Sequence, residues 1–296
     1  MTDLRRAAGG VLLMALVSAT CPTGARAEVG VAGGGASWNK IYILRSLVDD
    51  PDPVGISWVR YHADSPSRVV LNDGGSDNGD GAPSILLTPA GIPLVAWSRS
   101  SAQGFDVVVS RFDGGAWSAP EIVAGSGLDE LDPVLFADPS DGSVHVVYWI
   151  DDATPRVMHR QTPADLAAWN GPTQVSPPDE PACRPTGVVH AGVPRIVYET
   201  HDYGIGATPR QIVVATRAGT EFVSEMLAVT LHAEANWPQA HVAGGRVWID
   251  WIDGTGTMAW SRLEAGSWSP VQTEGFSGAE DREFHVRGRI RRLALD

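Results

Sequence analysis

The chain has 296 residues, 43% of them hydrophobic and 19% charged, so it can bury a sizeable core. Its 33 glycines and 21 prolines together make about 18% of the residues, above the ~12% of average usage, which favours many turns over long helices. The net charge of −13 excludes a general polyanion-binding surface, so nucleic acid is not an expected partner. This composition also excludes intrinsic disorder and collagen.

The N-terminus has the pattern of an export signal. Arg5 and Arg6 precede an apolar run from Val11 to Val17, and Ala25-Arg26-Ala27 then supplies a small-residue cleavage motif. The apolar run is too short to span a bilayer, and no later stretch is long and apolar enough to anchor the chain. We therefore expect a signal peptide over 1–27, a single domain over 28–296, and an exported protein, periplasmic or extracellular.

The chain contains two cysteines, Cys21 and Cys183. Cleavage after Ala27 removes the first, so no intrachain disulfide forms and the core alone must hold the fold. Cys183 lacks the local sequence of thiol enzymes and is expected to be a buried structural thiol. An alternative reading makes Cys21 a lipid attachment site, although Thr20 stands where a lipobox has Gly or Ala.

A repeat of about fifty residues organises most of the chain. Four strands start after a proline, at intervals of 50, 52 and 53 residues: Pro83, Pro133, Pro185 and Pro238. Each is followed by a turn with glycine and by a second apolar strand, ending near Trp97, Trp149, Glu199 and Trp251. A third strand then carries an arginine: Arg111, Arg160, Arg217 and Arg262. A fourth strand follows an aromatic residue: Trp117, Trp169, Phe222 and Trp268.

Each repeat is thus a meander of four short strands, which needs neighbours to cover both of its faces. The repeat predicts an all-β fold, a β-propeller of four-stranded blades. Counting the third strand at Arg60 gives five blades; six stay open, because the strand 38–45 is either part of a shared blade or of a sixth. Residues 284–288 resemble 240–244, and 289–295 read as the next strand. We therefore expect one blade to be closed by strands from both termini.

The segment 107–123 resembles the bacterial neuraminidase repeat of the sialidase superfamily. That repeat carries an Asp box, Ser/Thr-x-Asp-x-Gly-x-Thr-Trp, between the third and fourth strands. Three sets of residues keep parts of the box: Asp113, Gly115 and Trp117, then Glu264, Gly266 and Trp268, and an eroded copy at Trp169, Gly171 and Pro172. The first two copies are one residue shorter before the Trp. Such a carboxylate satisfies backbone N–H groups of a turn, so we read Asp113 and Glu264 as structural.

Ligand sites of a propeller lie at its central mouth, on the loops that join second to third strands and one blade to the next. The sequence places these candidate ligand-binding residues there: Arg99, Arg184, Arg282, His201, Asp253 and Trp237. Glu199 stands in a column otherwise formed by tryptophans, where burial would raise its pKa unless it is paired. The alternative for Glu199 is a buried carboxylate bonded to an arginine.

The resemblance also implies roles that an enzyme would need. A sialidase holds the substrate carboxylate with three arginines, for which Arg99, Arg184 and Arg282 are the candidates. Tyr203 with Glu199 would act as the nucleophile, and Asp151 as the acid/base. The Arg-Ile-Pro motif of that family is absent. A lectin needs only exposed aromatic faces, and Trp237 and Trp38 are the best candidates among the eleven tryptophans.

A metal centre has less support in the sequence than the carbohydrate hypotheses. His190, His241 and His285 recur near the ends of first strands, but in separate blades, so we expect no zinc site. The acidic stretch 73–80 could hold calcium but lacks EF-hand spacing, and a flexible loop is the simpler expectation.

The sequence therefore predicts an exported, monomeric propeller of the sialidase-repeat type. We expect it to bind a glycan or other small molecule, without an established catalytic centre and without a cofactor. The alternatives are a glycoside hydrolase with carboxylates and arginines at the mouth, and a protein-interaction scaffold.

Overall fold

The computed structural model describes residues 81–113, 116–200, 210–228, 235–253 and 257–274. It also describes, as backbone, the strands within residues 12–70. The described residues contain strands and turns only, and none of them forms a helix that could cross a membrane. The all-β prediction is confirmed.

Five antiparallel sheets follow one another along the chain and are called blades I to V. Blade I holds β1 (Leu12–Ala15), β4 (Lys40–Ser46), β5 (Ile56–His62) and β6 (Pro66–Val70). Blade II holds β7 (Gly81–Leu87), β8 (Pro93–Ser101), β9 (Gly104–Arg111) and β10 (Glu121–Ala124). Blade III holds β11 (Asp129–Ala137), β12 (Val144–Asp151), β13 (Arg156–Thr162) and β14 (Thr173–Gln174).

Blade IV holds β15 (Ala182–His190), β16 (Val193–Thr200), β17 (Ile212–Ala218) and β18 (Glu221–Ala228). Blade V holds β19 (Ala235–Ala243), β20 (Arg246–Asp253), β21 (Met258–Glu264), β22 (Ser267–Trp268) and β23 (Gln272–Glu274). A separate pair, β2 (Val17–Thr20) and β3 (Arg26–Val29), completes the described strands. Five sheets agree with the five predicted blades.

Blade I shows where the strand expected over 38–45 belongs, but it does not test the closure of the ring by both termini. The strand expected over 38–45 is β4, the second strand of blade I, rather than part of a sixth blade. The strand beside β4 is β1, which belongs to the predicted signal peptide. The strand expected over 289–295 lies outside the described residues, so closure by both termini stays a prediction.

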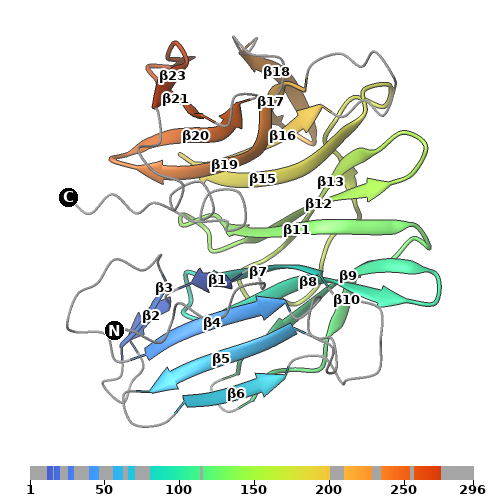
Figure 1. Ribbon diagram of the computed structural model, residues 1–296, viewed down its shortest axis with the longest axis vertical. Helices are drawn as coiled ribbons and strands as arrows, with labels where there is room; N and C mark the ends of the chain where they lie inside the picture. The colour runs from blue at the N-terminus through green and yellow to red at the C-terminus, as the bar shows by residue number, and fades with distance from the viewer. Residues whose placement is uncertain are drawn as a thin grey trace.

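Apolar seams hold the described blades together, and the second strands β8, β12 and β16 are buried on both faces. Val146 and Tyr148 of β12 pack toward blade II, whereas Val147 and Trp149 of the same strand pack toward blade IV. The seam between blades IV and V is built in the same way, with Trp251 only 1% exposed. In Figure 1, blades II to V succeed one another, with β11, β15 and β19 side by side.

The first strands, β7, β11, β15 and β19, are edge strands that together line a cavity of about 760 Å³. Each strand contributes side chains from its second half, among them Leu86, Phe136, Val188 and Val242. The first halves of the same strands therefore lie toward the opposite end, where the sequence predicts the mouth.

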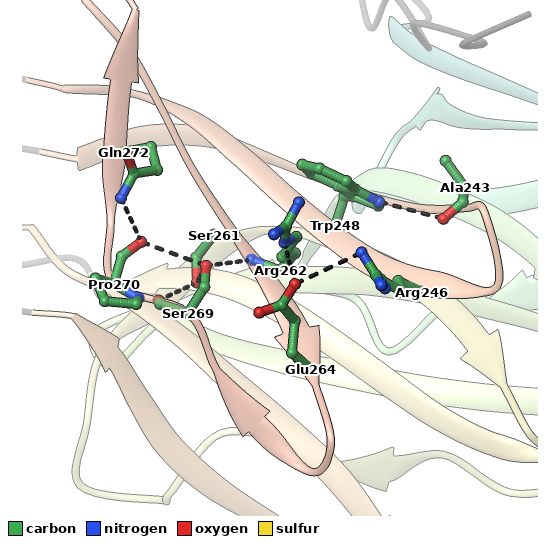
Figure 2. Close-up of polar contacts among 9 residues, drawn as sticks. All are labelled: Ala243, Arg246, Trp248, Ser261, Arg262, Glu264, Ser269, Pro270 and Gln272. Atoms are coloured by element: carbon green, nitrogen blue, oxygen red, sulfur yellow. Dashed lines mark hydrogen bonds and ion pairs between the residues drawn. The ribbon is translucent and has the colours of Figure 1, made fainter.

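The turns before the outer strands carry a repeated polar lock. In blade II, Ser118 donates its N–H to the carbonyl of Arg111 and accepts the Arg111 N–H on its hydroxyl. In blade V, Ser269 makes the same two bonds with Arg262, and Figure 2 shows this lock next to Glu264. Ser118 and Ser269 therefore take the same place in the repeat, one residue after Trp117 and Trp268.

The two carboxylates read as structural behave differently. Asp113 accepts the N–H of Ala116 at 2.8 Å, as a turn carboxylate should. Glu264 instead lies between two arginines, 2.5 Å from Nε of Arg262 and 3.5 Å from Nη1 of Arg246 (Figure 2). Both therefore serve turns or surface pairs.

Candidate functional site

Each first strand of blades II to V contains a β-bulge at the same place. The register shifts between Gly81 and Ser84 in β7, and at the matching points of the other three strands. The residue before the proline has a left-handed backbone in every case: Ala82 (φ 47°), Asp132 (φ 50°), Arg184 (φ 50°) and Trp237 (φ 53°). A residue before proline normally avoids this conformation, so each position stores strain, about 1–3 kcal/mol by general experience.

Bulged residues of neighbouring blades meet each other. The guanidinium carbon of Arg184, from β15, lies 5.3 Å from the ring centroid of Trp237, from β19, which is a cation–π distance. Trp237 is 37% exposed, an unusual value for an indole on an inner strand, and the Arg184 side chain is 32% exposed. The exposure predicted for Trp237 is confirmed, and two of the strained positions, Arg184 and Trp237, present side chains to solvent at the end of the blades where the sequence predicts the mouth.

Glu199, at the end of β16, is bonded to both members of this pair. Its side chain is fully buried; Oε1 lies 2.6 Å from Nη1 of Arg184 and accepts the Cys183 thiol at 3.4 Å. Its Oε2 accepts the backbone N–H of Trp237 at 3.1 Å. Burial raises the pKa of Glu199, while the charge of Arg184 opposes that rise. One carboxylate thus fixes a cation of blade IV and a strained peptide of blade V.

In blade III, the hydrogen bond between the second strand and the bulged residue runs in the opposite direction. Trp149 donates its indole N–H to the carboxylate of the bulged residue Asp132 at 3.0 Å. In blade IV the bulged residue Arg184 is the donor, and Glu199 is the acceptor. The two blades therefore keep one hydrogen bond between the second strand and the bulge, and exchange which side carries the negative charge.

The predicted column of Glu199 needs a correction. Glu199 lies opposite Cys183, and Trp149 lies opposite the matching Leu131, so these two are equivalent. Trp97 and Trp251 instead lie opposite the bulges, in the places that Tyr148 and Tyr198 take in blades III and IV. The predicted matching of the repeats is wrong for Trp97 and Trp251, because the turns between first and second strands differ in length.

The structure places the other predicted residues unequally. Arg99 on β8 and Asp151 on β12 lie at the same end of their blades as the bulges. Asp253 is 4% exposed and accepts the N–H of Thr257 at 2.9 Å, so it closes a turn. His201, Tyr203 and Arg282 lie outside the described residues.

Cys183 is 2% exposed, as predicted for a structural thiol, and burial raises the pKa of its thiol. Asp132 belongs to the site as a bulged residue, and Cys183 belongs to it through its contact with Glu199. Their signal in the sequence is the position one or two residues before a repeat proline.

Two of the histidines considered for a metal have different neighbours. His190 bonds the carbonyl of Gly245 at 2.8 Å, whereas His241 lies 3.4 Å from Asp250. Within the described residues no three His, Cys, Asp or Glu side chains converge on one point. His285 and the acidic stretch 73–80 lie outside the described residues.

No protein-family model and no curated protein matches the chain. Solved structures do. An α-L-arabinanase of Penicillium chrysogenum, complexed with arabinobiose, has a TM-score of 0.55 at 16% identity over 88% of this chain and 84% of that one. A thermostable family-43 glycoside hydrolase has 0.55 at 13% identity over 82% and 91%. The Hadza microbial sialidase Hz136 has 0.52 at 14% identity over 76% of this chain and 55% of that one.

The chain folds as a β-propeller. At these identities the likeness shows the fold alone. In this propeller the strained residues of β11, β15 and β19, with Glu199 bonded to those of β15 and β19, form the candidate site.

Proposed function

We propose that the mouth of this propeller binds carbohydrate, with Trp237 and Arg184 as its main contacts. The observation that carries the proposal is a partly exposed indole beside a guanidinium that a fully buried carboxylate holds in place. The C–H face of a sugar ring can cover an indole, and a planar guanidinium can donate to its hydroxyl or carboxylate oxygens. The solved structures of similar fold, which include an arabinanase and a sialidase, support a glycan as the ligand.

The geometry of Glu199 favours binding over hydrolysis. A nucleophile or acid/base must reach the substrate with a free oxygen. Both oxygens of Glu199 are already hydrogen-bonded, and the side chain has no exposed surface. We therefore assign Glu199 the role of positioning Arg184 and the strained Trp237 peptide. Arg99 and Asp151, from the same end of blades II and III, would widen the binding surface, as would His201 and Arg282.

The proposal includes export and a monomeric state. The first 27 residues have the pattern of a signal peptide, and within the described residues no helix could cross a membrane. Glycans of an envelope or of the surroundings are the ligands that such a protein would meet.

A glycan array tests this proposal with the wild type, Trp237→Ala and Trp268→Ala. Trp268 lies on the outer strand β22 of blade V, donates its indole N–H to Glu225 at 2.9 Å, and serves as the matched indole control. We expect Trp237→Ala to lose at least tenfold in affinity, about 1.4 kcal/mol, and Trp268→Ala to keep the binding of the same glycan. If Trp237→Ala binds every glycan as tightly as the wild type does, the proposed site is wrong.

The hydrolase reading has its own assay. Fluorogenic sialoside and arabinofuranoside substrates are incubated with the wild type and Glu199→Gln. Turnover by the wild type that Glu199→Gln abolishes would replace the binding module by an enzyme. We expect no turnover by either protein.

A further inference from the structure

The seam between blades II and III contains a loop that the repeat does not need. By strand register, Arg111, Gln161, Thr216 and Arg262 take the same place in blades II to V. The aromatic residue before the outer strand follows six residues later in blades II, IV and V. In blade III it follows eight residues later, at Trp169, so this turn is two residues longer.

The longer turn keeps the polar lock of the other blades. Asn170 donates its N–H to the carbonyl of Gln161 at 2.8 Å, and its side-chain oxygen accepts the Gln161 N–H at 2.7 Å. These are the two bonds that Ser118 makes with Arg111 in blade II. Since the lock is complete, the two added residues serve something other than closure of the turn.

The added residues have a fixed shape. Leu166 has a left-handed backbone (φ 58°) and packs on the core of the seam, while its N–H bonds the carbonyl of Pro163 at 2.9 Å. Asp165 accepts the N–H of Ala167 at 3.1 Å. A strained non-glycine residue persists only where its surroundings hold it. The loop therefore has one fixed conformation and can form the wall of a cavity.

This wall and blade II enclose a cavity of about 290 Å³, close to the lower end of ordinary ligand pockets. Its polar and aromatic lining comes from both blades: Arg111, Ser118 and Glu121 on one side, Asp165 and Trp169 on the other. Leu94 and Val109 form its apolar floor. The volume and the mixture of surfaces suit one or two sugar rings.

The charged groups at this cavity are open to a ligand. Within the described part of the chain, the side chains of Arg111 and Glu121 make no hydrogen bond or ion pair, although many other charged side chains there do. Two carboxylates against one guanidinium leave the cavity with one net negative charge. This sign disfavours an acidic sugar and suits hydroxyl groups, which donate to carboxylates and accept from a guanidinium.

We infer that this cavity is a second, peripheral carbohydrate site that takes a neutral sugar. Trp169 offers the aromatic surface, Glu121 and Asp165 accept hydroxyl protons, and Arg111 donates. The site goes beyond the proposed function at the mouth and does not depend on it, because the two share no residue.

Titration calorimetry tests the inference with four neutral disaccharides, arabinobiose, cellobiose, lactose and maltose, each up to ~10 mM, and with 3′-sialyllactose. The variants are Glu121→Gln and Asp165→Asn, both on exposed residues, then Trp169→Ala, with Trp237→Ala as the control for the mouth. Circular dichroism and the Tm of each variant show that it is folded.

We expect at least one neutral disaccharide to bind, and Glu121→Gln and Asp165→Asn to weaken it about five- to tenfold each. Trp237→Ala should leave this binding unchanged, which separates failure of this site from failure of the mouth. The inference is overturned if no neutral disaccharide binds, or if the binding survives in Glu121→Gln, Asp165→Asn and Trp169→Ala.

Discussion

His145 and His159 share a hydrogen bond of 2.9 Å, from Nδ1 to Nε2, in the seam between blades III and IV, where each is 1% exposed. The ring of Phe136 stacks on His145 at 4.9 Å, and Phe222 of blade IV meets His159 edge-on at 5.3 Å. In such a bond one imidazole donates and the other must accept through an unprotonated nitrogen, which burial favours by keeping both rings neutral near pH 7. Burial lowers the pKa of His145 to about 4 and that of His159 to about 3.

The charged groups around the pair do not reverse this effect. Arg217 lowers the pKa of both imidazoles further, and His145 lowers that of His159. Asp138 and Asp141 raise the pKa of His145, but by less than burial lowers it.

The pair should make the protein labile to mild acid. Because the folded pKa values lie below the ordinary 6.5, the unfolded chain binds protons that the folded chain refuses. The stability that the neutral pair provides is complete above pH 6.5 and is lost as the pH falls toward about 4. The slope is at most about 1.4 kcal/mol per pH unit for each histidine. Urea unfolding at a series of pH values between 7.5 and 4.5 measures this loss.

Blade II supplies the control for this measurement, since Leu94 and Val109 occupy the equivalent places there. The double variant His145→Leu with His159→Val should retain more of its neutral-pH stability at pH 4.5 than the wild type does. Equal losses in the two proteins would show that other groups govern the acid response.

Arg184 should matter most at neutral and alkaline pH. Its removal leaves the buried Glu199 carboxylate without its cation, and burial already raises the pKa of that group. A carboxyl whose folded pKa exceeds its unfolded value loses stability as the pH rises, because it must ionise in a buried place. We expect Arg184→Ala to cost about 2–3 kcal/mol at pH 8, discounted for the partial exposure of Arg184, and clearly less at pH 5. Urea unfolding at both pH values, with Arg111→Ala as an exposed arginine control, gives the comparison; a gap that does not change with pH would contradict the pairing.

The architecture could be predicted because its signals are local and repeated. Each first strand contains a proline at the same place, which the structure shows to be a bulge inside the strand rather than its start, each second strand is mostly apolar, and each turn between them has glycine. The register between the first and second strands could not be predicted, since it depends on hydrogen bonds across a turn of variable length. For that reason the sequence pattern matches Trp97 and Trp251 to Trp149, although their register makes them equivalent to Tyr148 and Tyr198.

The site could be predicted in part. Arg184 and Trp237 were singled out because they precede repeat prolines, and the pairing of Glu199 with an arginine was one of two readings. The left-handed backbone at those positions has no sequence signal, because a residue before proline usually prefers an extended conformation. The His145–His159 pair was also invisible, since two histidines fourteen residues apart meet only through the pairing of β12 with β13.

Gly187 tests how tightly the first strands pack. A Cβ at this position in β15 would lie 2.2 Å from Cε1 of Phe136 in β11, well inside van der Waals contact. We expect Gly187→Ala to destabilise the protein by about 1–3 kcal/mol, as overpacking of a core usually does. Gly171→Ala, where an added Cβ meets nothing within 4 Å, should be neutral.

Phe136→Leu in the Gly187→Ala background should restore part of that stability, and a double-mutant cycle would report the coupling between the two positions. Additive effects in urea unfolding would argue against direct contact between β11 and β15 at this point.

The predicted closure of the ring by both termini leads to a prediction about maturation. The strand beside β4 is β1, and the predicted cleavage after Ala27 removes it. The edge of β4 would then be open, and an open edge is unstable and prone to aggregate unless another strand pairs with it. The segment 289–295 reads as that strand.

We therefore expect the exported protein to begin at Glu28, which intact mass spectrometry checks. Deletion of 283–296 should lower the Tm strongly in a chain that starts at Glu28, and much less in one that starts at Met1 and keeps β1. A deletion that leaves the Tm of the chain from Glu28 unchanged would show that the C-terminal segment does not close the ring. A Tm that falls equally in both chains would show that β1 cannot take that place.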